Sequence, residues 1–195
     1  YTLAHIKHYR TKTIEEYIAE FRLGLLTDTL DIEGNIIKES KVNINKDDLV
    51  NALNKIKGKY MQTVPIYSAI KVNGKKLYEY ARNNIEVELP KHEVDIKEIE
   101  LLEYNNDLFK IRTKVSKGTY IRSLGNDIAS MLNTNATMTS LRRTKQGAFD
   151  IKDAINIPYD MIDENTELDK DKNIFVYCKS GNRSKIAYDN LTSLG

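Results

Sequence analysis

The chain has 195 residues, enough for one well-packed core or for one domain joined to part of another. Its hydrophobic fraction is 41%, and no stretch approaches the roughly 20 consecutive apolar residues of a membrane-spanning helix. One cysteine and three histidines exclude an internal disulfide framework and make a metal site unexpected. With no basic-then-apolar leader at the start, these features predict a cytoplasmic protein without a membrane segment.

Charge is unevenly distributed along the chain, although the net charge is only +2. Residues 110–147 contain eight basic side chains and one acid, whereas residues 150–171 contain eight acids and two lysines. The basic stretch predicts a surface that binds phosphates. The change of sign near residue 150 predicts a domain boundary.

The first half of the chain shows a strand pattern followed by a helix pattern. Residues 13–26 alternate, with apolar side chains on one face, which is typical of a half-buried strand. Turn residues follow in 27–35. Asn45, with Asp48 three positions later, predicts the start of a helix that Gly58 ends.

The second half repeats this order. Residues 107–115 alternate apolar side chains with three cations, which predicts a strand with one buried face, and the charged face is in isolation an ordinary solvated one. Residues 121–132 fit an apolar helical face. Residues 173–177 predict a short strand, and residues 186–194 a closing helix. We expect an α+β fold, a mixed, largely antiparallel sheet with flanking helices, followed by a small βα tail.

The segment VPIYSAIKVNGKKLYEYAR, residues 64–82, is rich in tyrosines and cations, and Asn73-Gly74 predicts a tight turn within it. Aromatic rings beside cations suit an RNA binder, because unstacked bases stack on rings and phosphates need positive charge. On composition alone, the alternative is an ordinary hairpin with tyrosines in its core.

The string from Gln62 to Arg82 closely resembles a segment of the bacterial tRNA pseudouridine synthase B (TruB) family, with the pattern Q-x-x-P-x-Y-S-A-I-K-V-N-G-K-x-L-Y-E-x-A-R. Further similar segments follow in the family's order: EYIAEFRLGLLTDTLDIEG at 16–34, VSKGTYIRSLGNDI at 115–128 and LRRTKQGAF at 141–149. The resemblance predicts that residues 1–150 are a partial pseudouridine synthase catalytic domain.

The resemblance implies that a uridine in the T arm of tRNA is flipped into a pocket and isomerised without a cofactor, by a monomeric enzyme with an aspartate nucleophile. Tyr67 would stack on the flipped base, and Tyr120 would lie against the same pocket as a general base or positioning group. Arg122 would pair with the aspartate, and Leu141 would help to close the pocket. Phosphate contacts would come from Lys71, Lys117, Arg142 and Arg143. Taken singly, each tyrosine is explained by core packing and each arginine by solubility.

The family's nucleophile lies in a G-H-x-G-x-L-D-P segment that these 195 residues do not contain. Residues 1–9 resemble the stretch just downstream of it, so we expect an N-terminally truncated chain that binds RNA without catalysis. Asp31, in Thr29-Leu30-Asp31, is a weaker substitute, because a turn whose carboxylates bond their own backbone explains it better.

Residues 151–195 resemble the second half of a rhodanese-like domain, a sulfurtransferase fold. The resemblance rests on a C-x-x-G-x-R-S loop that contains Cys178, Gly181, Arg183 and Ser184. A cysteine under backbone N–H groups and a helix N-terminus has a stabilised thiolate, which implies a persulfide carrier. The alternative is a buried cysteine at the end of a core strand. The join of two incomplete families is consistent with a natural fusion, an assembly artefact or a deliberate chimera.

Overall fold

The computed structural model of the chain describes residues 14–147, 149–150, 162–163 and 182–193. The strand predicted at 173–177 lies outside the described residues, as do Cys178 and Gly181. Arg183 and Ser184 belong to a described helix, but their side chains lie outside the description.

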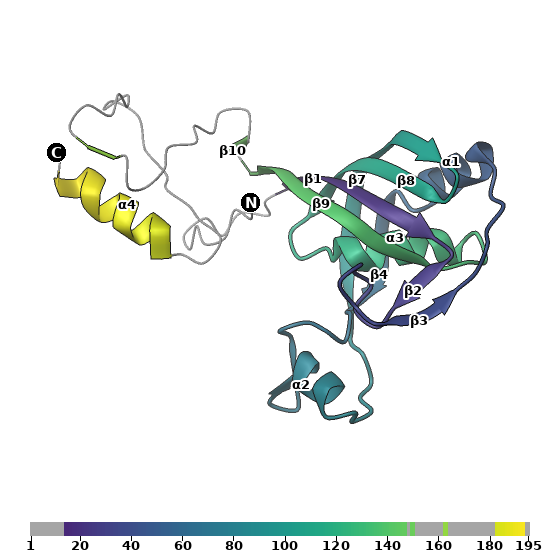
Figure 1. The fold of residues 1–195 in the computed structure, drawn as a ribbon, viewed down its shortest axis with the longest axis horizontal. Coiled ribbons are helices and arrows are strands. Elements are labelled where there is room, and N and C mark those ends of the chain that lie inside the picture. The colour runs from purple at the N-terminus through teal and green to yellow at the C-terminus, as the bar shows by residue number, and fades with distance from the viewer. Residues whose placement is uncertain (1–13, 148, 151–161, 164–181, 194–195) are drawn as a thin grey trace.

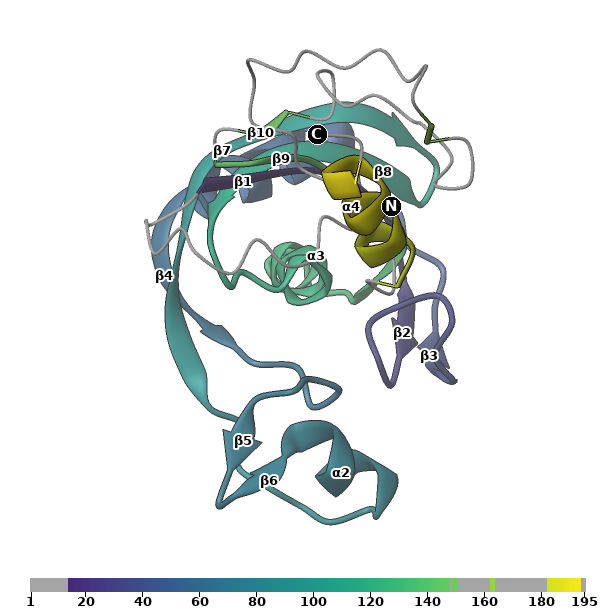
Figure 2. The ribbon, with the colours of Figure 1, turned by 90° about the vertical axis from the view of Figure 1, so that its left-hand side faces the viewer.

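Six antiparallel strands form the main sheet, in the order β10-β9-β1-β8-β7-β4 (Figure 1). Their bounds are β1 Ile14–Leu23, β4 Gly58–Thr63, β7 Lys91–Asn105, β8 Leu108–Ser116, β9 Ala136–Gln146 and β10 Phe149–Asp150. Figure 2 shows the sheet curling around helix α3 (Ile121–Ser130). The α+β prediction with a largely antiparallel sheet is therefore confirmed.

Alternation places one face of β1 and one face of β8 in the core. Every second residue of β1 from Tyr17 to Leu23 is buried, and the same holds for β8 from Phe109 to Val115. Phe21 lies directly opposite Phe109 in the register, and their rings stack with centroids 5.1 Å apart. The strand interpretation of both segments is confirmed, with β1 ending at Leu23.

Helices α1 (Lys46–Lys55) and α3 contribute apolar side chains to the same core. The Asn45 side chain caps α1 by accepting the Asp48 N–H at 2.8 Å, as the sequence predicted. The helix ends at Lys55, shortly before Gly58 as predicted, and the φ of +96° at Gly58 lets the chain enter β4. Gly125 of α3 lies so close to the Phe21 ring that a Cβ there would overlap it.

Two smaller units project from the body (Figure 2). One is the hairpin of β2 (Leu25–Thr27) and β3 (Ile36–Glu39). The other, which we call the arm, spans residues 64–90 and contains β5 (Lys71–Val72), β6 (Lys75–Lys76) and α2 (Leu77–Arg82).

The predicted turn at Asn73-Gly74 is confirmed, since both residues have positive φ, 50° and 82°, as a tight hairpin turn requires. The predicted closing helix is also present, as α4 (Asn182–Ser193). Among the described residues, no helix is long and apolar enough to cross a membrane.

Candidate functional site

The N-terminus of α3 carries two of the predicted site residues, Tyr120 and Arg122. The loop after β8 turns at Gly118, which has a φ of +88°, and Thr119 Oγ1 donates to Ser116 O at 2.7 Å. Tyr120 is the N-cap residue of α3, and its side chain makes no capping hydrogen bond. The loop therefore places both candidate side chains at the start of a helix that packs on the sheet.

Arg122 joins three segments that are far apart in the sequence. Its Nη1 donates to Thr29 O at 2.8 Å, and its Nη2 donates to Tyr67 O at 3.1 Å. In the described part of the chain, no carboxylate lies within ion-pair distance of this guanidinium. The two carbonyl partners fix the orientation of the guanidinium, and its charge has no carboxylate partner among the described residues.

The turn that Arg122 contacts is held by its own acidic side chains. Asp28 accepts hydrogen bonds from the backbone and side-chain amides of Asn35, both at 2.9 Å. These bonds, together with one from the Tyr67 hydroxyl, lower the pKa of the Asp28 carboxyl. Asp31 accepts the Glu33 N–H at 3.2 Å. The turn interpretation of these carboxylates is confirmed, and nothing in this geometry favours Asp31 as a nucleophile.

Tyr120 is attached to strand β4 by a residue that sequence reasoning did not select. Gln62 is fully buried; its Oε1 accepts the Tyr120 N–H at 2.8 Å, and its Nε2 donates to Tyr120 O at 3.2 Å. The Gln62 Nε2 also donates to the Tyr60 hydroxyl, which donates to Asp127 Oδ2, each at 2.9 Å. In the sequence, the feature that could have pointed to Gln62 is an amide side chain at an inward position of a strand, where a buried polar group needs hydrogen-bond partners.

Burial shifts the acid–base behaviour of this network. Desolvation raises the pKa of the Asp127 carboxyl, although hydrogen bonds from Tyr60 and Gln62 act in the opposite direction. It also raises the pKa of the Tyr60 hydroxyl, which therefore keeps its proton at neutral pH. Beside the network, His92 meets the Tyr120 ring edge-on, with centroids 5.9 Å apart, and its Nε2 lies 3.1 Å from Gly118 O.

The residues predicted to contact phosphates differ in their exposure and in the hydrogen bonds that they make within the protein. Lys71, Lys117 and Arg142 are exposed, and Leu141 is 44% exposed on the same strand as Arg142. Arg143 is engaged: its Nε donates to the Tyr17 hydroxyl at 2.9 Å, its Nη1 donates to the Gln146 side chain at 3.0 Å, and it lies over the Tyr17 ring. The structure therefore favours Arg142 over Arg143 as a phosphate contact.

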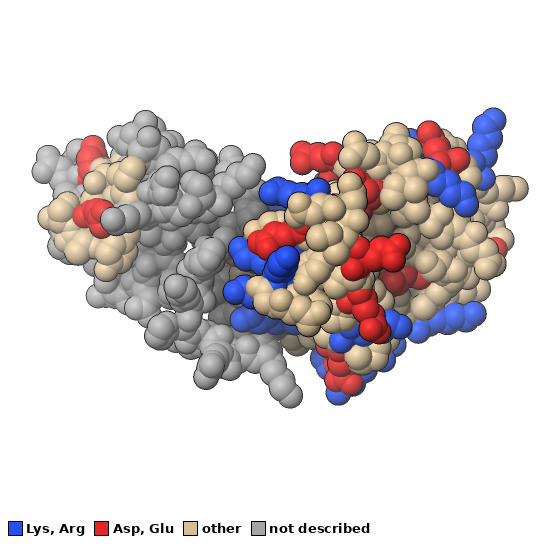
Figure 3. All heavy atoms as spheres, turned by 90° about the horizontal axis from the view of Figure 1, so that it is seen from below, with Lys and Arg blue, Asp and Glu red and all other residues tan. Residues whose placement is uncertain are grey.

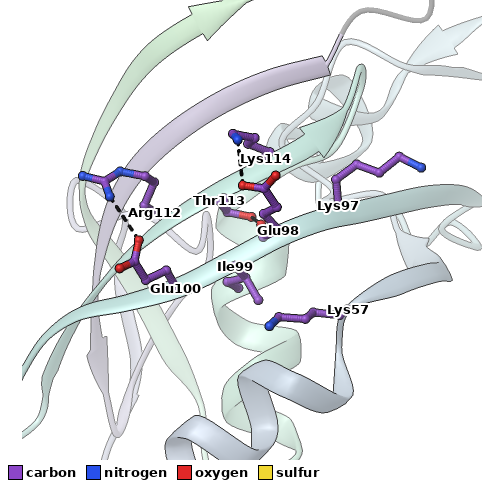
Figure 4. A pocket seen from close by; sticks show the side chains of 8 residues that line it. All are labelled: Lys57, Lys97, Glu98, Ile99, Glu100, Arg112, Thr113 and Lys114. Carbon is purple, nitrogen blue, oxygen red and sulfur yellow. Dashed lines mark hydrogen bonds and ion pairs between the residues drawn. The ribbon is translucent and has the colours of Figure 1, made fainter.

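The cations of β8, which belong to the basic stretch, lie beside acidic side chains of β7. On the outward face of the sheet, each lies in ion-pair distance of a β7 glutamate, at 3.8 Å for Lys110–Glu103, 3.0 Å for Arg112–Glu100 and 2.7 Å for Lys114–Glu98. The last two pairs, drawn in Figure 4, line a hollow whose volume is about 250 Å³. These pairs favour the solvated-face alternative for β8, because cross-strand acids offset the basic charge.

Two hollows of the described body lie away from Arg122. One is that of Figure 4, and the other, of about 870 Å³, lies near Arg22, Tyr104 and Asp107. Figure 3 shows basic and acidic side chains intermingled on a further face, with basic groups gathered at one edge of the described body. The candidate site is defined by hydrogen bonds that converge on Arg122 and Tyr120.

Comparison with known families agrees with this arrangement. A family model described as TruB family pseudouridylate synthase (N terminal domain) matches residues 4–121, which include the turn beside Arg122, the whole arm and Tyr120. The chain belongs to the TruB family. The resemblance inferred from the sequence is confirmed. A second model, the rhodanese-like domain, matches residues 130–195 and so begins before the predicted boundary at 151, overlapping β9 of the TruB-family sheet.

Curated relatives extend the similarity beyond Tyr120. The chain is 42% identical over 154 residues to the tRNA pseudouridine synthase B of Caldicellulosiruptor saccharolyticus, covering 79% of this chain and 54% of the relative. It is 48% identical over 136 residues to that of Fusobacterium nucleatum, covering 70% of this chain and 47% of the relative. The chain therefore spans about half the length of these two TruB-family relatives.

Among solved structures, the chain is similar to part of a crystal structure of a Cbf5-Nop10-Gar1 complex. The TM-score is 0.50 and the sequence identity is 25%, over 70% of this chain and 31% of the other. This likeness agrees with the TruB-family assignment of the curved antiparallel sheet.

Proposed function

We propose that this chain carries the RNA-receiving part of a tRNA pseudouridine synthase site. The observation that carries the proposal is the double hydrogen bond of Arg122 to Thr29 O and Tyr67 O, which gathers three segments of the family pattern around one uncompensated cation. In the proposal, the Tyr67 ring stacks on a uridine flipped out of the T arm, Tyr120 lies against the same pocket, and Arg122 faces the catalytic carboxylate.

RNA contacts outside the pocket come from exposed cations. Lys71 on the arm, Lys117 before α3 and Arg142 on β9 are exposed side chains on three separate elements. Each would neutralise one phosphate, which positions the RNA without reading its sequence. Leu141, exposed beside Arg142, is the proposed pocket-closing residue.

The working state in the proposal is a monomer in the cytoplasm that acts on the T arm of tRNA, with residues 1–150 as the synthase part. Isomerisation needs a carboxylate nucleophile, which the family carries in a G-H-x-G-x-L-D-P segment that is absent from these 195 residues. We therefore expect this polypeptide by itself to bind RNA without turnover.

Two measurements test the proposal. Release of tritium from tRNA labelled at carbon 5 of uridine reports isomerisation, and turnover by this 195-residue chain would contradict binding without catalysis. Binding to a T-arm hairpin over a range of salt concentrations reports the phosphate contacts. Arg142→Ala is expected to reduce the salt slope by about 1. Arg143→Ala is the matched control, because Arg143 is engaged with Tyr17 and Gln146; an equal reduction would contradict the assignment.

A second function, sulfur transfer by Cys178, is favoured by the match of the rhodanese-like model to residues 130–195. In this proposal Cys178 carries the persulfide, and Gly181, Arg183 and Ser184 form the donor loop in a partial rhodanese-like segment at 151–195. Transfer of sulfur from thiosulfate to cyanide that disappears with Cys178→Ser would support it, and no transfer by the unaltered chain would remove it.

A further inference from the structure

Helix α3 begins with a residue that is poorly suited to its position. N-cap positions favour serine, threonine, aspartate and asparagine, whose side chains accept a hydrogen bond from the first turn. Here the N-cap is Tyr120, with extended backbone angles (φ −83°, ψ 106°) and no side-chain cap. Such a conflict between local preference and structure is expected where another part of the fold holds the residue in place.

Gln62 is the residue that holds it. Its side-chain amide makes two hydrogen bonds with one residue, accepting the Tyr120 N–H at 2.8 Å and donating to Tyr120 O at 3.2 Å. This arrangement imitates the pairing of two strands, and it ties the backbone of Tyr120 to β4. Because Gln62 is fully buried, water does not compete for these bonds.

Tyr60 and Asp127 determine which way the Gln62 amide faces. The Tyr60 hydroxyl gives its proton to Asp127 Oδ2, so that its oxygen accepts the Gln62 Nε2 at 2.9 Å. A flipped amide would place Oε1 against two oxygens and Nε2 against the Tyr120 N–H. Asp127 also lies on α3, so β4 contacts this helix near both its start and its last turn.

The bonds form a closed circuit around the site. Residues 63–66 connect Gln62 to Tyr67, whose carbonyl oxygen accepts from Arg122 Nη2 at 3.1 Å. Arg122 lies two positions after Tyr120, and the Tyr120 N–H donates back to Gln62. We propose that Gln62 is a positioning residue, which sets the spacing of Tyr120 and Arg122 from Tyr67. What enters that space rests on the proposed function, whereas the spacing itself rests on the hydrogen bonds.

A merely structural role for Gln62 has a different signature. If it only stabilised the fold, its loss would weaken every RNA contact together or none of them. If it positions the pocket, its loss affects recognition of the flipped base and spares the phosphate contacts of Lys71, Lys117 and Arg142. The pair of RNAs that separates these cases is a T-arm hairpin with the target uridine and the same hairpin with an abasic nucleotide there.

The test compares the full chain with Gln62→Leu, and with Thr113→Val as a matched control. Thr113 is also fully buried and donates one hydrogen bond, to Glu98 O at 2.8 Å, but it lies on β8 and bonds to no site residue. Gln62→Leu is expected to lower affinity for the uridine hairpin about tenfold and to leave the abasic hairpin unchanged. Thr113→Val is expected to change the affinity for the two hairpins by the same factor. Equal weakening of both hairpins by Gln62→Leu would overturn the inference.

Hydrogen exchange at the Tyr120 amide supplies a readout without RNA. The amide is expected to be protected in the unaltered chain and in Thr113→Val, and to exchange at least about tenfold faster in Gln62→Leu. Unchanged protection in Gln62→Leu would overturn the inference whatever the RNA shows. If the unaltered chain binds neither hairpin, the proposed function fails, and exchange alone decides the role of Gln62. Should Gln62→Leu not fold, Gln62→Met carries both measurements, since its flexible side chain of similar size removes both the acceptor for the Tyr120 N–H and the amide donors.

Discussion

Arginine side chains on the two sides of the main sheet have different kinds of partner. On the inner face, Arg122 reaches from α3 to two backbone carbonyls, and no carboxylate of the described residues offsets its charge. On the outer face, Arg112 bonds Glu100 at 3.0 Å, and its neighbours on β8 are paired in the same way. Both arginines come from one basic stretch of sequence.

The difference shows that a count of cations does not identify a binding surface. A cation bonded to carbonyls remains a source of positive potential, whereas a cation paired with a carboxylate adds little to the field that an RNA phosphate experiences. The inner face is also tied to the core through Phe21 and Gly125, so its geometry depends on packing. The outer face depends on exposed pairs, which contribute little to stability.

Phe21→Ala should have the largest effect, because the ring stacks on Phe109 and contacts Gly125 of α3. We expect the free energy of unfolding to fall by about 3–5 kcal/mol. Chemical denaturation measures it, with Lys110→Ala on the outer face as the control, expected to change it by less than about 1 kcal/mol. Similar losses in the two variants would contradict the contrast between the faces.

Arg122→Lys should come next. A lysine ammonium lacks the fork that reaches Thr29 O and Tyr67 O together, so one carbonyl loses its partner. We expect a loss of about 1–2 kcal/mol in unfolding free energy, together with weaker binding of the uridine hairpin. The matched change Arg112→Lys keeps a cation beside Glu100 and is expected to leave both quantities nearly unchanged. An equal response of the two would show that the inner arginine has no special role.

Asp127→Asn tests the buried network through pH. Burial raises the pKa of Asp127 in the folded state above its ordinary value of 3.8. The contribution of this carboxyl to stability is therefore fully present below 3.8 and is lost as the pH rises through the folded-state pKa. Asparagine keeps an acceptor for the Tyr60 hydroxyl and does not ionise. The Tm of Asp127→Asn relative to the unaltered chain should therefore increase as the pH rises above about 4. A difference in Tm that stays constant with pH would contradict the burial of an ionised carboxylate.

The double change Glu98→Gln and Glu100→Gln should have the smallest effect on stability, below about 1 kcal/mol per pair. Its consequence is electrostatic, because Lys114 and Arg112 lose the acids that offset them. We expect the salt slope of non-specific RNA binding to increase in magnitude by up to about 2, and the preference for the uridine hairpin to stay unchanged. No change in slope would mean that this face stays away from RNA even when its charge is released.

Local patterns in the sequence predicted much of the fold. Alternation located β1 and β8, the pair Asn45 and Asp48 located the start of α1, and Asn73-Gly74 located the turn of the arm. These features succeed because period and capping act between residues that are close in the chain. Helix α1 also stops shortly before Gly58, as predicted, and the positive φ of this glycine then turns the chain into β4.

For the site, the sequence by itself determined the family, through strings that include Tyr67, Tyr120 and Arg122. Only the tertiary structure decided which cations are offset by acids and which residue holds Tyr120. Both depend on contacts between distant segments: the β8 cations meet glutamates across a strand pair, and Gln62 meets Tyr120 from another strand. Local patterns carry no information about such partners, and a buried amide acquires its role only when the fold brings its partners within hydrogen-bond distance.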